Sequence, residues 1–202
     1  MGCQQAVNPG KQCRKWLWQR LKEVFGPLCL LPHEALRALH QHLYRKEVET
    51  IIDLDIANYF GTIDHGLLEA MLCEKIKDER FMRYMKRMFK AGVLTAGELT
   101  VSEEGVSQGR CCSPVLANIF AHHVIDTWFE AVVKQHCRGQ VALYRYADDA
   151  VICCQYTRDA ERILRALRQR LAKYHLRLNE EKTQLVPFAT QVARARRATR
   201  SL

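Results

Sequence analysis

No stretch of the sequence is apolar for long enough to cross a membrane. A transmembrane helix needs roughly 20 mainly apolar residues in a row, whereas the apolar segment Pro27–Leu31 is followed at once by Pro32. The opening segment Met1–Ala6 lacks the apolar core of a secretory signal, and Ala6 stands where a myristoylation signal requires Ser or Thr. We therefore expect a soluble protein without a membrane partner.

The sequence also lacks the cysteine pattern of a secreted or zinc-binding protein. It has nine cysteines, an odd number, with no CxxC pair and with two adjacent pairs, Cys111–Cys112 and Cys153–Cys154. Such cysteines do not suit a disulfide framework, and the neighbouring His122–His123 side chains would point to different sides of a helix. We expect reduced cysteines in the cytoplasm, no disulfide-linked partner and no structural zinc site.

Acidic residues are outnumbered by basic ones, 22 against 31, which gives a net charge of +9 over 202 residues. Clustered Lys and Arg attract polyanions such as nucleic acids, because binding releases counterions from the phosphates. Charge alone does not separate such proteins from basic proteins that bind no nucleic acid. With 48% hydrophobic residues the chain should fold, and its length suits one compact domain or one piece of a larger enzyme.

Hydrophobic periodicity predicts helices and strands in an α+β order. Helices are expected at about 32–45, from an N-cap at Asp64, at about 79–90, from an N-cap at Ser113, and around Ile163–Leu171; strands are expected at 48–56, 141–146, 150–155 and 183–188, with a hairpin at 92–105. Ala147, Asp148 and Asp149 should form a tight turn between two strands. This order predicts an antiparallel sheet with helices packed on one face.

Both ends of the chain are basic. Residues 1–26 have apolar positions at loosely helical spacing and predict a basic N-terminal helical segment. Residues 189–202 contain four arginines and no acid, which predicts a solvated, disordered tail.

Three carboxylates stand at positions where a structural role alone would make them costly. Asp55 ends an apolar strand, and Asp148 and Asp149 occupy the tip of a hairpin whose strands are mainly apolar. Clustered anions repel each other unless a cation compensates them, and oxygen ligands select hard ions such as Mg²⁺. The alternative for a single Asp pair is that turns simply favour Asp.

Four segments resemble the group II intron reverse transcriptase and maturase family, in the same order along the chain. They are DLDIANYF (53–60) with IDH (63–65), GVSQG (105–109) with SPVLANI (113–119), YRYADD (144–149), and LNEEKT (178–183). The resemblance covers roughly residues 25–188 and implies that 27–188 form the palm of a polymerase, with part of the entry to the fingers and no thumb.

The resemblance implies a site for two metal ions. Asp55 and Asp148 take the positions of the carboxylates that bridge the two ions, and Asp149 would complete the site. The backbone carbonyl of Ile56 is a further expected ligand. Asp53 lies on the same strand face as Asp55 and is the alternative if the register differs. The expected ions are Mg²⁺, with Mn²⁺ as a substitute.

The resemblance also implies a nucleotide site. Phe60 stands where an aromatic ring excludes the ribose 2′-hydroxyl and so selects deoxynucleotides; its alternative role is core packing. Gln108 is expected to contact the incoming nucleotide. Lys182 is expected near the nucleotide's phosphates, where it would donate a proton to pyrophosphate, although a lysine before a strand is more often solvated.

Several residues depart from the family pattern. Ser107 replaces a usual Pro, Arg110 a usual Gly, and Gly61 an Asp that commonly follows the aromatic residue. None of these is an expected metal ligand. The family's basic fingers segment should precede Gly26, and its thumb should follow Phe188, so the sequence suggests a fragment or a decayed copy.

We therefore predict an RNA-directed DNA polymerase of a group II intron-like retroelement, acting on an RNA template such as intron RNA, a DNA primer and deoxynucleoside triphosphates. One alternative is a truncated remnant that binds RNA without polymerising. Reverse transcriptases of retrons or diversity-generating elements fit less well, because the segments 63–65 and 181–183 look more like the intron enzymes.

Overall fold

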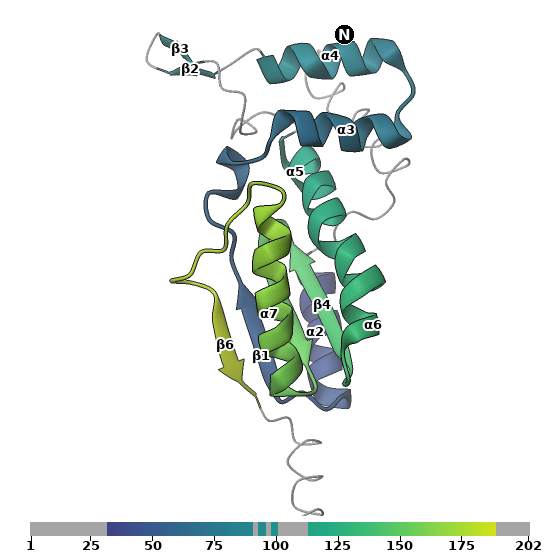
Figure 1. Cartoon of the computed structure of the whole chain (residues 1–202), viewed down its shortest axis with the longest axis vertical. Coiled ribbons are helices and arrows are strands. Elements are labelled where there is room, and N and C mark those ends of the chain that lie inside the picture. Colours follow the sequence, from purple (N-terminus) through teal and green to yellow (C-terminus); the bar gives the residue numbers. More distant parts are fainter. Residues whose placement is uncertain (1–31, 91–92, 96–97, 101–112, 189–202) are drawn as a thin grey trace, which may run out of the picture.

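The computed structural model describes residues 32–90, 93–95, 98–100 and 113–188 (Figure 1). The predicted N-terminal helical segment at 1–26, the basic tail at 189–202 and the GVSQG segment lie outside the described residues.

A four-stranded antiparallel sheet forms the centre of the described structure. Its strands are β1 (Thr50–Leu54), β4 (Val141–Tyr146), β5 (Asp149–Cys154) and β6 (Gln184–Pro187), in the order β4-β5-β1-β6. In β1 the buried residues Thr50, Ile52 and Leu54 alternate with more exposed ones, as in a strand with one face on a core. The predicted strand at 48–56 was longer than β1, and Ile56 instead forms an isolated bridge with Leu178.

Two long helical segments cover one face of this sheet. One consists of α5 (Ser113–Ala121), the π-helical segments η2 (His122–Asp126) and η3 (Phe129–Val133), and α6 (Lys134–His136); the other is α7 (Thr157–Ala172). Their apolar stripes meet the buried side of the strands in one core. The predicted α+β fold with helices on an antiparallel sheet is therefore confirmed.

The apolar stripes of these helices fall where periodicity predicts them. In the first segment Leu116, Phe120 and Val124 are fully buried, and in α7 Ile163 and Leu167 are buried. The predicted helix start differs by one residue, because α5 begins at Ser113 itself and not after it.

The π-helical turns were not predicted, and side chains bond to the backbone carbonyls there. Arg170 on α7 donates hydrogen bonds of 3.1 Å to the carbonyl of Val124 and of 3.5 Å to that of His123. The hydroxyl of Thr127 donates to the carbonyl of His122 at 3.0 Å. These bonds satisfy carbonyls at a π-helical turn, where the regular α-helical pattern is interrupted.

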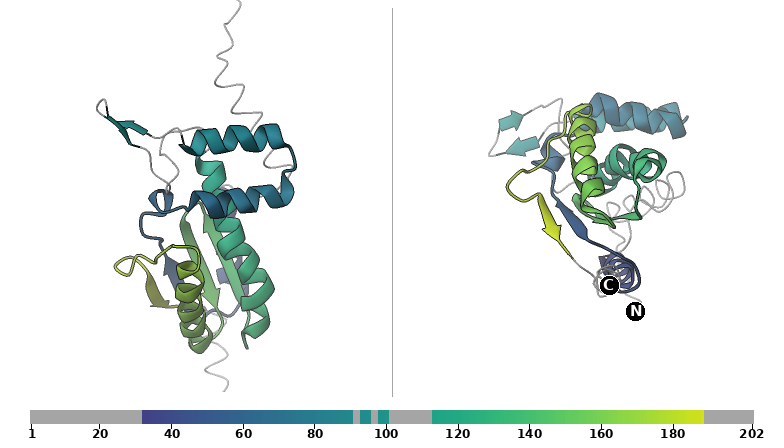
Figure 2. Two further views of the ribbon diagram at one scale, coloured as in Figure 1. Left: turned by 45° about the horizontal axis from the view of Figure 1, so that its top comes forward. Right: turned by 60° about the horizontal axis from the view of Figure 1, so that its bottom comes forward.

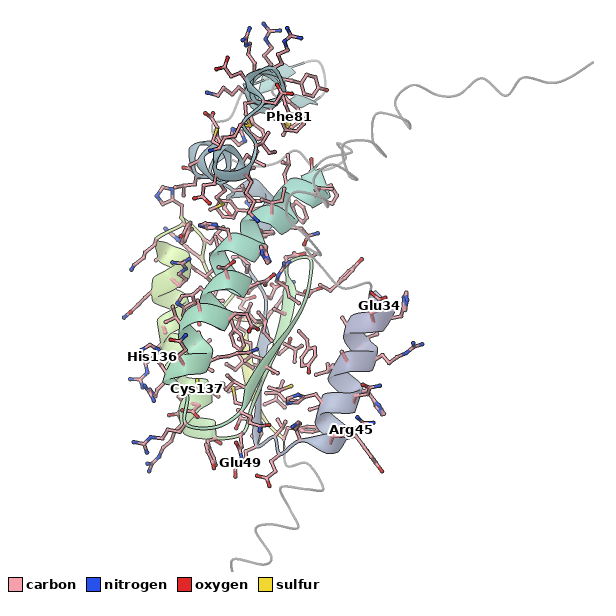
Figure 3. All side chains as sticks on the ribbon, turned by 90° about the vertical axis from the view of Figure 1, so that its right-hand side faces the viewer. Glu34, Arg45, Glu49, Phe81, His136 and Cys137 are labelled. Carbon is pink, nitrogen blue, oxygen red and sulfur yellow. The ribbon has the colours of Figure 1, made fainter. Side chains whose placement is uncertain are left out.

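A further helix, α2 (Pro32–Arg45), lies on the other side of the sheet from α6 (Figure 3). The ring of His42 on α2 contacts Tyr144 of β4 edge to face, with 5.8 Å between ring centroids. Arg145, the next residue of β4, bonds to η2 instead, because successive side chains of a strand point to opposite faces. Helices thus lie on both sides of β4.

A pair of helices extends the fold beyond one end of the sheet. These are α3 (His65–Lys75) and α4 (Glu79–Lys90), which Figure 2 shows side by side; the hairpin β2 (Val93–Thr95) and β3 (Glu98–Thr100) follows them. Asp64 caps α3 as predicted, since its Oδ1 accepts a bond of 2.8 Å from the backbone N–H of Leu67. Within the described residues, no helix is sufficiently long and apolar to span a bilayer.

Candidate active site

β1 and β4 run toward the same end of the sheet (Figure 1), and the predicted carboxylates of Asp55, Asp148 and Asp149 belong to the residues at that end. Leu54 pairs with Ala150, so Asp55, the next residue, comes opposite Asp149. Leu54 and Ala150 are buried on the side of α5 and α7. Because side chains alternate along strands, the side chains of Asp55 and Asp149 lie on the other face of the sheet.

The β4–β5 turn differs from the prediction by one residue. Tyr146 pairs with Asp149, so Asp149 is the first residue of β5 and the turn consists of Ala147 and Asp148. Ala147 has a φ of 54°, a left-handed conformation that two-residue hairpins require at their first turn position and that residues other than glycine adopt at a cost. Asp148 is half-buried beside it, whereas Asp149 is exposed.

A buried arginine donates a hydrogen bond to this turn. Arg145 is 6% exposed, and its Nη1 donates a hydrogen bond of 2.7 Å to the carbonyl of Ala147. Its Nε and Nη2 each donate a 2.7 Å bond to one carboxylate oxygen of Asp126, and Nη1 also donates to Asn118 Oδ1 at 2.9 Å. Two-point pairing with a carboxylate compensates a buried guanidinium.

Asp126 is ionised in this network. Its burial favours the neutral acid, but hydrogen bonds from Arg145 and His122, together with their charges, outweigh burial and lower its pKa below the ordinary value. The distance from His122 Nδ1 to Asp126 Oδ2 is 3.1 Å. The sequence interpretation assigned no role to Arg145, Asp126 or Asn118. Arg145 is a charged residue in a mainly apolar strand, and this was the signal that could have indicated a buried ion pair.

Asp55 is held by the loop that precedes β6. Asn179 donates from Nδ2 to Asp55 Oδ2 at 2.8 Å and from its backbone N–H to the Asp55 carbonyl at 2.9 Å. The hydroxyl of Thr183 lies 3.3 Å from the same carbonyl. Lys182 Nζ lies 3.5 Å from Asp55 Oδ2, and the lysine side chain is 69% exposed. The LNEEKT segment therefore supports one of the predicted metal ligands.

The negative charges at this end of the sheet act on Asp149. Although the Asp149 residue is exposed, its carboxyl loses part of its hydration, which raises its pKa; the negative charges of Asp148, Asp55 and Asp53 raise it further, and the charge of Lys182 lowers it. Charged oxygens that repel one another fit a divalent cation, and oxygen is the ligand type that Mg²⁺ takes.

These carboxylates do not form a closed metal cage. In the part of the chain that the structure describes, no group of three or more His, Cys, Asp or Glu side chains is gathered closely enough to hold an ion. Mg²⁺ is usually bound by one or two carboxylates together with phosphates of the substrate and water, so an open set of aspartates fits this ion.

The Ile56 carbonyl follows Asp55 in the chain and makes no hydrogen bond of the bridge between Ile56 and Leu178. The two hydrogen bonds of that bridge run from Asn179 N–H to the Asp55 carbonyl and from Ala57 N–H to the Arg177 carbonyl. Its role as a metal ligand stays a prediction.

Phe60 lies on the short helix η1 (Tyr59–Gly61) that follows β1. Its ring is half-buried, packs against the core and meets the ring of Tyr59 edge to face at 5.7 Å. Tyr59 anchors η1, because its hydroxyl donates a 2.6 Å bond to the carbonyl of Ala117, and burial raises its pKa above the ordinary range. Core packing of Phe60 is thus observed, and its role in nucleotide selection stays a prediction.

Gly61, one of the departures from the family pattern, has little space for a side chain. A Cβ atom at this position would lie 2.5 Å from Asn58 Nδ2, so any other residue would have to displace the Asn58 side chain. Gln108, Ser107 and Arg110 lie outside the described residues, and the predicted nucleotide contact of Gln108 stays a prediction.

Comparison with known proteins identifies relatives for this architecture. A family model described as reverse transcriptase (RNA-dependent DNA polymerase) matches residues 7–193. Protein YkfC of Escherichia coli (strain K12) is 30% identical over 162 residues, which are 67% of this chain and 42% of YkfC. The group II intron-encoded protein LtrA of Lactococcus lactis subsp. cremoris is 34% identical over 92 residues, 46% of this chain and 15% of LtrA.

A solved structure shares the fold. The apo telomerase of Candida tropicalis superposes with a TM-score of 0.66 at 14% identity, covering 89% of this chain and 36% of the telomerase chain. At this identity the likeness concerns the fold alone, a polymerase palm.

The chain is thus shorter than its relatives, and it spans less than half of YkfC. The family match nevertheless extends over most of the sequence, and the resemblance to group II intron-encoded proteins is confirmed. The chain belongs to the reverse transcriptase (RNA-dependent DNA polymerase) family.

Proposed function

We propose that this chain is the palm of an RNA-directed DNA polymerase of a group II intron-like retroelement. The observation that carries the proposal is the placement of Asp55, Asp148 and Asp149 at one end of an antiparallel sheet, with Asp55 and Asp149 on the face away from α5 and α7. The reaction is nucleotidyl transfer: the 3′-hydroxyl of a DNA primer attacks a deoxynucleoside triphosphate, and pyrophosphate leaves.

The residues that would hold two Mg²⁺ ions are Asp55, Asp148 and Asp149, with the carbonyl of Ile56; Mn²⁺ is the expected substitute. When bound, such ions favour the deprotonated form of the primer hydroxyl and neutralise charge on the triphosphate and the departing pyrophosphate. The contribution of the chain is the placement of its oxygens. Asn179 orients one oxygen of Asp55, and the Ala147 carbonyl is held by Arg145.

The nucleotide would lie over this same end of the sheet. Lys182 is a cation on the loop beside Asp55, from which its exposed side chain could reach a phosphate and donate a proton to pyrophosphate. Phe60, on the element that follows Asp55 in the chain, would exclude a ribose 2′-hydroxyl. Gln108 would contact the nucleotide from the GVSQG segment.

The proposed partners are an RNA template, such as intron RNA, and a DNA primer, and the proposed location is the cytoplasm. The chain spans 42% of YkfC, so a complete polymerase would need further segments to hold the duplex. Positioning supplies much of the rate in metal-assisted displacement. We therefore expect the isolated chain to bind RNA weakly and to extend primers poorly or not at all.

Primer extension tests the proposal. A chimera of residues 27–188 with the fingers and thumb of a relative should extend a DNA primer on an RNA template in Mg²⁺, and the same chimera carrying Asp148→Asn should not. A chimera that binds primer-template but remains inactive would favour the alternative, an RNA-binding remnant. Processive synthesis by the isolated chain would contradict the expectation that further segments are required.

A further inference from the structure

Arg145 connects the helical segment that runs from α5 to α6 with the turn that carries Asp148. Its guanidinium is buried, and among the described residues it donates to both oxygens of Asp126, to the side-chain oxygen of Asn118 and to the carbonyl of Ala147. A guanidinium has donors in a fixed planar arrangement. Because one rigid group bonds to both the helix and the turn, it fixes the position of the turn relative to the helix.

The helix side of this network is built from one helical face. Asn118, His122 and Asp126 follow one another at intervals of four residues, which places them on the same side of the helix. The ring of His122 lies 3.1 Å from Asp126 Oδ2, the oxygen that also accepts from Arg145 Nη2. Asp126 therefore has little freedom to turn away from Arg145.

The turn side of the network is a residue in an unfavourable conformation. Ala147 has a φ of 54°, and residues with a Cβ adopt the left-handed region only where their surroundings favour it. The bond from Arg145 Nη1 to the Ala147 carbonyl is such an interaction. It acts on the peptide group that joins Ala147 to Asp148, so it bears directly on where the Asp148 carboxylate points.

We propose that Arg145 is a positioning residue, held by Asp126 and Asn118, that sets the orientation of Asp148 in the metal site. The inference rests on the proposed function of Asp148 as a metal ligand. It assigns to Arg145 a role beyond stabilising the core: a variant that keeps the charge and the fold, but loses the planar guanidinium, weakens metal binding.

The test is a titration of the full chain with Mn²⁺, in which the electron paramagnetic resonance signal measures the concentration of free ion. Asp148→Asn identifies binding at the proposed site. Arg145→Lys should weaken that binding by about tenfold, the lower range for loss of a group that orients a metal ligand. Thermal unfolding of each variant reports the structural loss separately.

Arg170→Lys is the matched control. The guanidinium of Arg170 also donates hydrogen bonds to backbone carbonyls, those of Val124 and His123 on η2. It thus contacts the same helical segment as Arg145 does, but none of these bonds reaches the β4–β5 turn. Arg170→Lys should lower the melting temperature without changing Mn²⁺ affinity. Equal loss of affinity in the two variants, or unchanged affinity in Arg145→Lys, would overturn the inference.

A milder pair of variants decides the matter if Arg145→Lys does not fold. Asn118→Asp keeps an acceptor for Arg145 Nη1, whereas Asn118→Leu removes it and leaves the Arg145–Asp126 pair in place. Asn118→Leu should bind Mn²⁺ more weakly than Asn118→Asp, and equal affinities would refute the positioning role. If Asp148→Asn binds Mn²⁺ as the unchanged chain does, the proposed function of Asp148 itself fails, a result distinct from an effect confined to Arg145.

Discussion

Asn179 donates a hydrogen bond of 2.8 Å from its side-chain amide to Oδ2 of Asp55, across 124 residues of sequence. The backbone N–H of Asn179 also bonds to the Asp55 carbonyl, at 2.9 Å. Side chain and backbone of one residue thus fix both the carboxylate and the peptide of the other. The loop before β6 is in this way part of the candidate active site, although it supplies no expected metal ligand.

Asn179→Ala should lower both stability and metal affinity. Loss of a hydrogen bond to a charged group costs about 1.5–3 kcal/mol, which urea unfolding measures. Asp55 also becomes free to rotate, which a Mn²⁺ titration detects. Gln155→Ala is the control, because Gln155 makes the same kind of bond, 2.9 Å from its amide to Glu47, at the other end of β5. It should lose stability alone; a fall in Mn²⁺ affinity in the control would contradict a specific role for Asn179.

The Asp126 carboxylate predicts a loss of stability in acid. Its pKa in the folded chain is lowered from 3.8, so its ionisation stabilises the fold above that pH. This contribution disappears as the pH falls below 3.8 and through the lower folded-state pKa. Urea unfolding of the unchanged chain and of Asp126→Asn at pH 7, 5, 3.5 and 2.5 measures it. The two should differ most at pH 7 and converge in acid, and a constant difference would count against the prediction.

Divalent ions should raise the melting temperature. A Mn²⁺ concentration about 100 times the Kd stabilises the native state by about 2.7 kcal/mol, which corresponds to a rise of about 5–10 °C for a chain of this size. Asp148→Asn combined with Asp149→Asn should abolish the rise. Glu130→Gln combined with Glu161→Gln changes the net charge equally at exposed positions and should leave it intact. A rise that survives in the aspartate variant would place the ion elsewhere.

Phe60→Ala should weaken discrimination against ribonucleotides. In the chimera with fingers and thumb, the variant should incorporate ribonucleotides more readily and still use deoxynucleotides, because the ring that would collide with the 2′-hydroxyl is gone. Phe81→Ala removes another half-buried ring that packs on the core and serves as the control. Both should cost stability, about 2 kcal/mol for a half-buried ring. Unchanged discrimination in Phe60→Ala would leave Phe60 with packing alone.

Much of the fold follows from local sequence patterns. The helix predicted at 79–90 has these bounds in α4, and the cap of Asp64 on α3 was predicted from residue type and position. The strand at β1 was predicted from its β-branched residues, and its alternating burial is the geometry of a strand with one face on a core. These features depend on neighbours in the chain, which the sequence displays directly.

The supporting contacts of the site could not be predicted in the same way. Arg145 meets Asp126 and Asn118 from 19 and 27 residues away, and such pairs depend on how a helix packs on a strand. The turn was placed one residue too long, because Asp149 is compatible with either a turn or the start of a strand. Its pairing with Tyr146 decides for the strand.

Anomalous diffraction from a crystal grown with Mn²⁺ and a deoxynucleoside triphosphate tests the metal site most directly. Two anomalous peaks should lie between the end of β1 and the β4–β5 turn, about 2.0–2.4 Å from oxygens of Asp55 and Asp148, with Asp53 outside the coordination sphere. Ordered Mn²⁺ at other carboxylates, with no peak beside Asp55 and Asp148, would contradict the two-metal polymerase site.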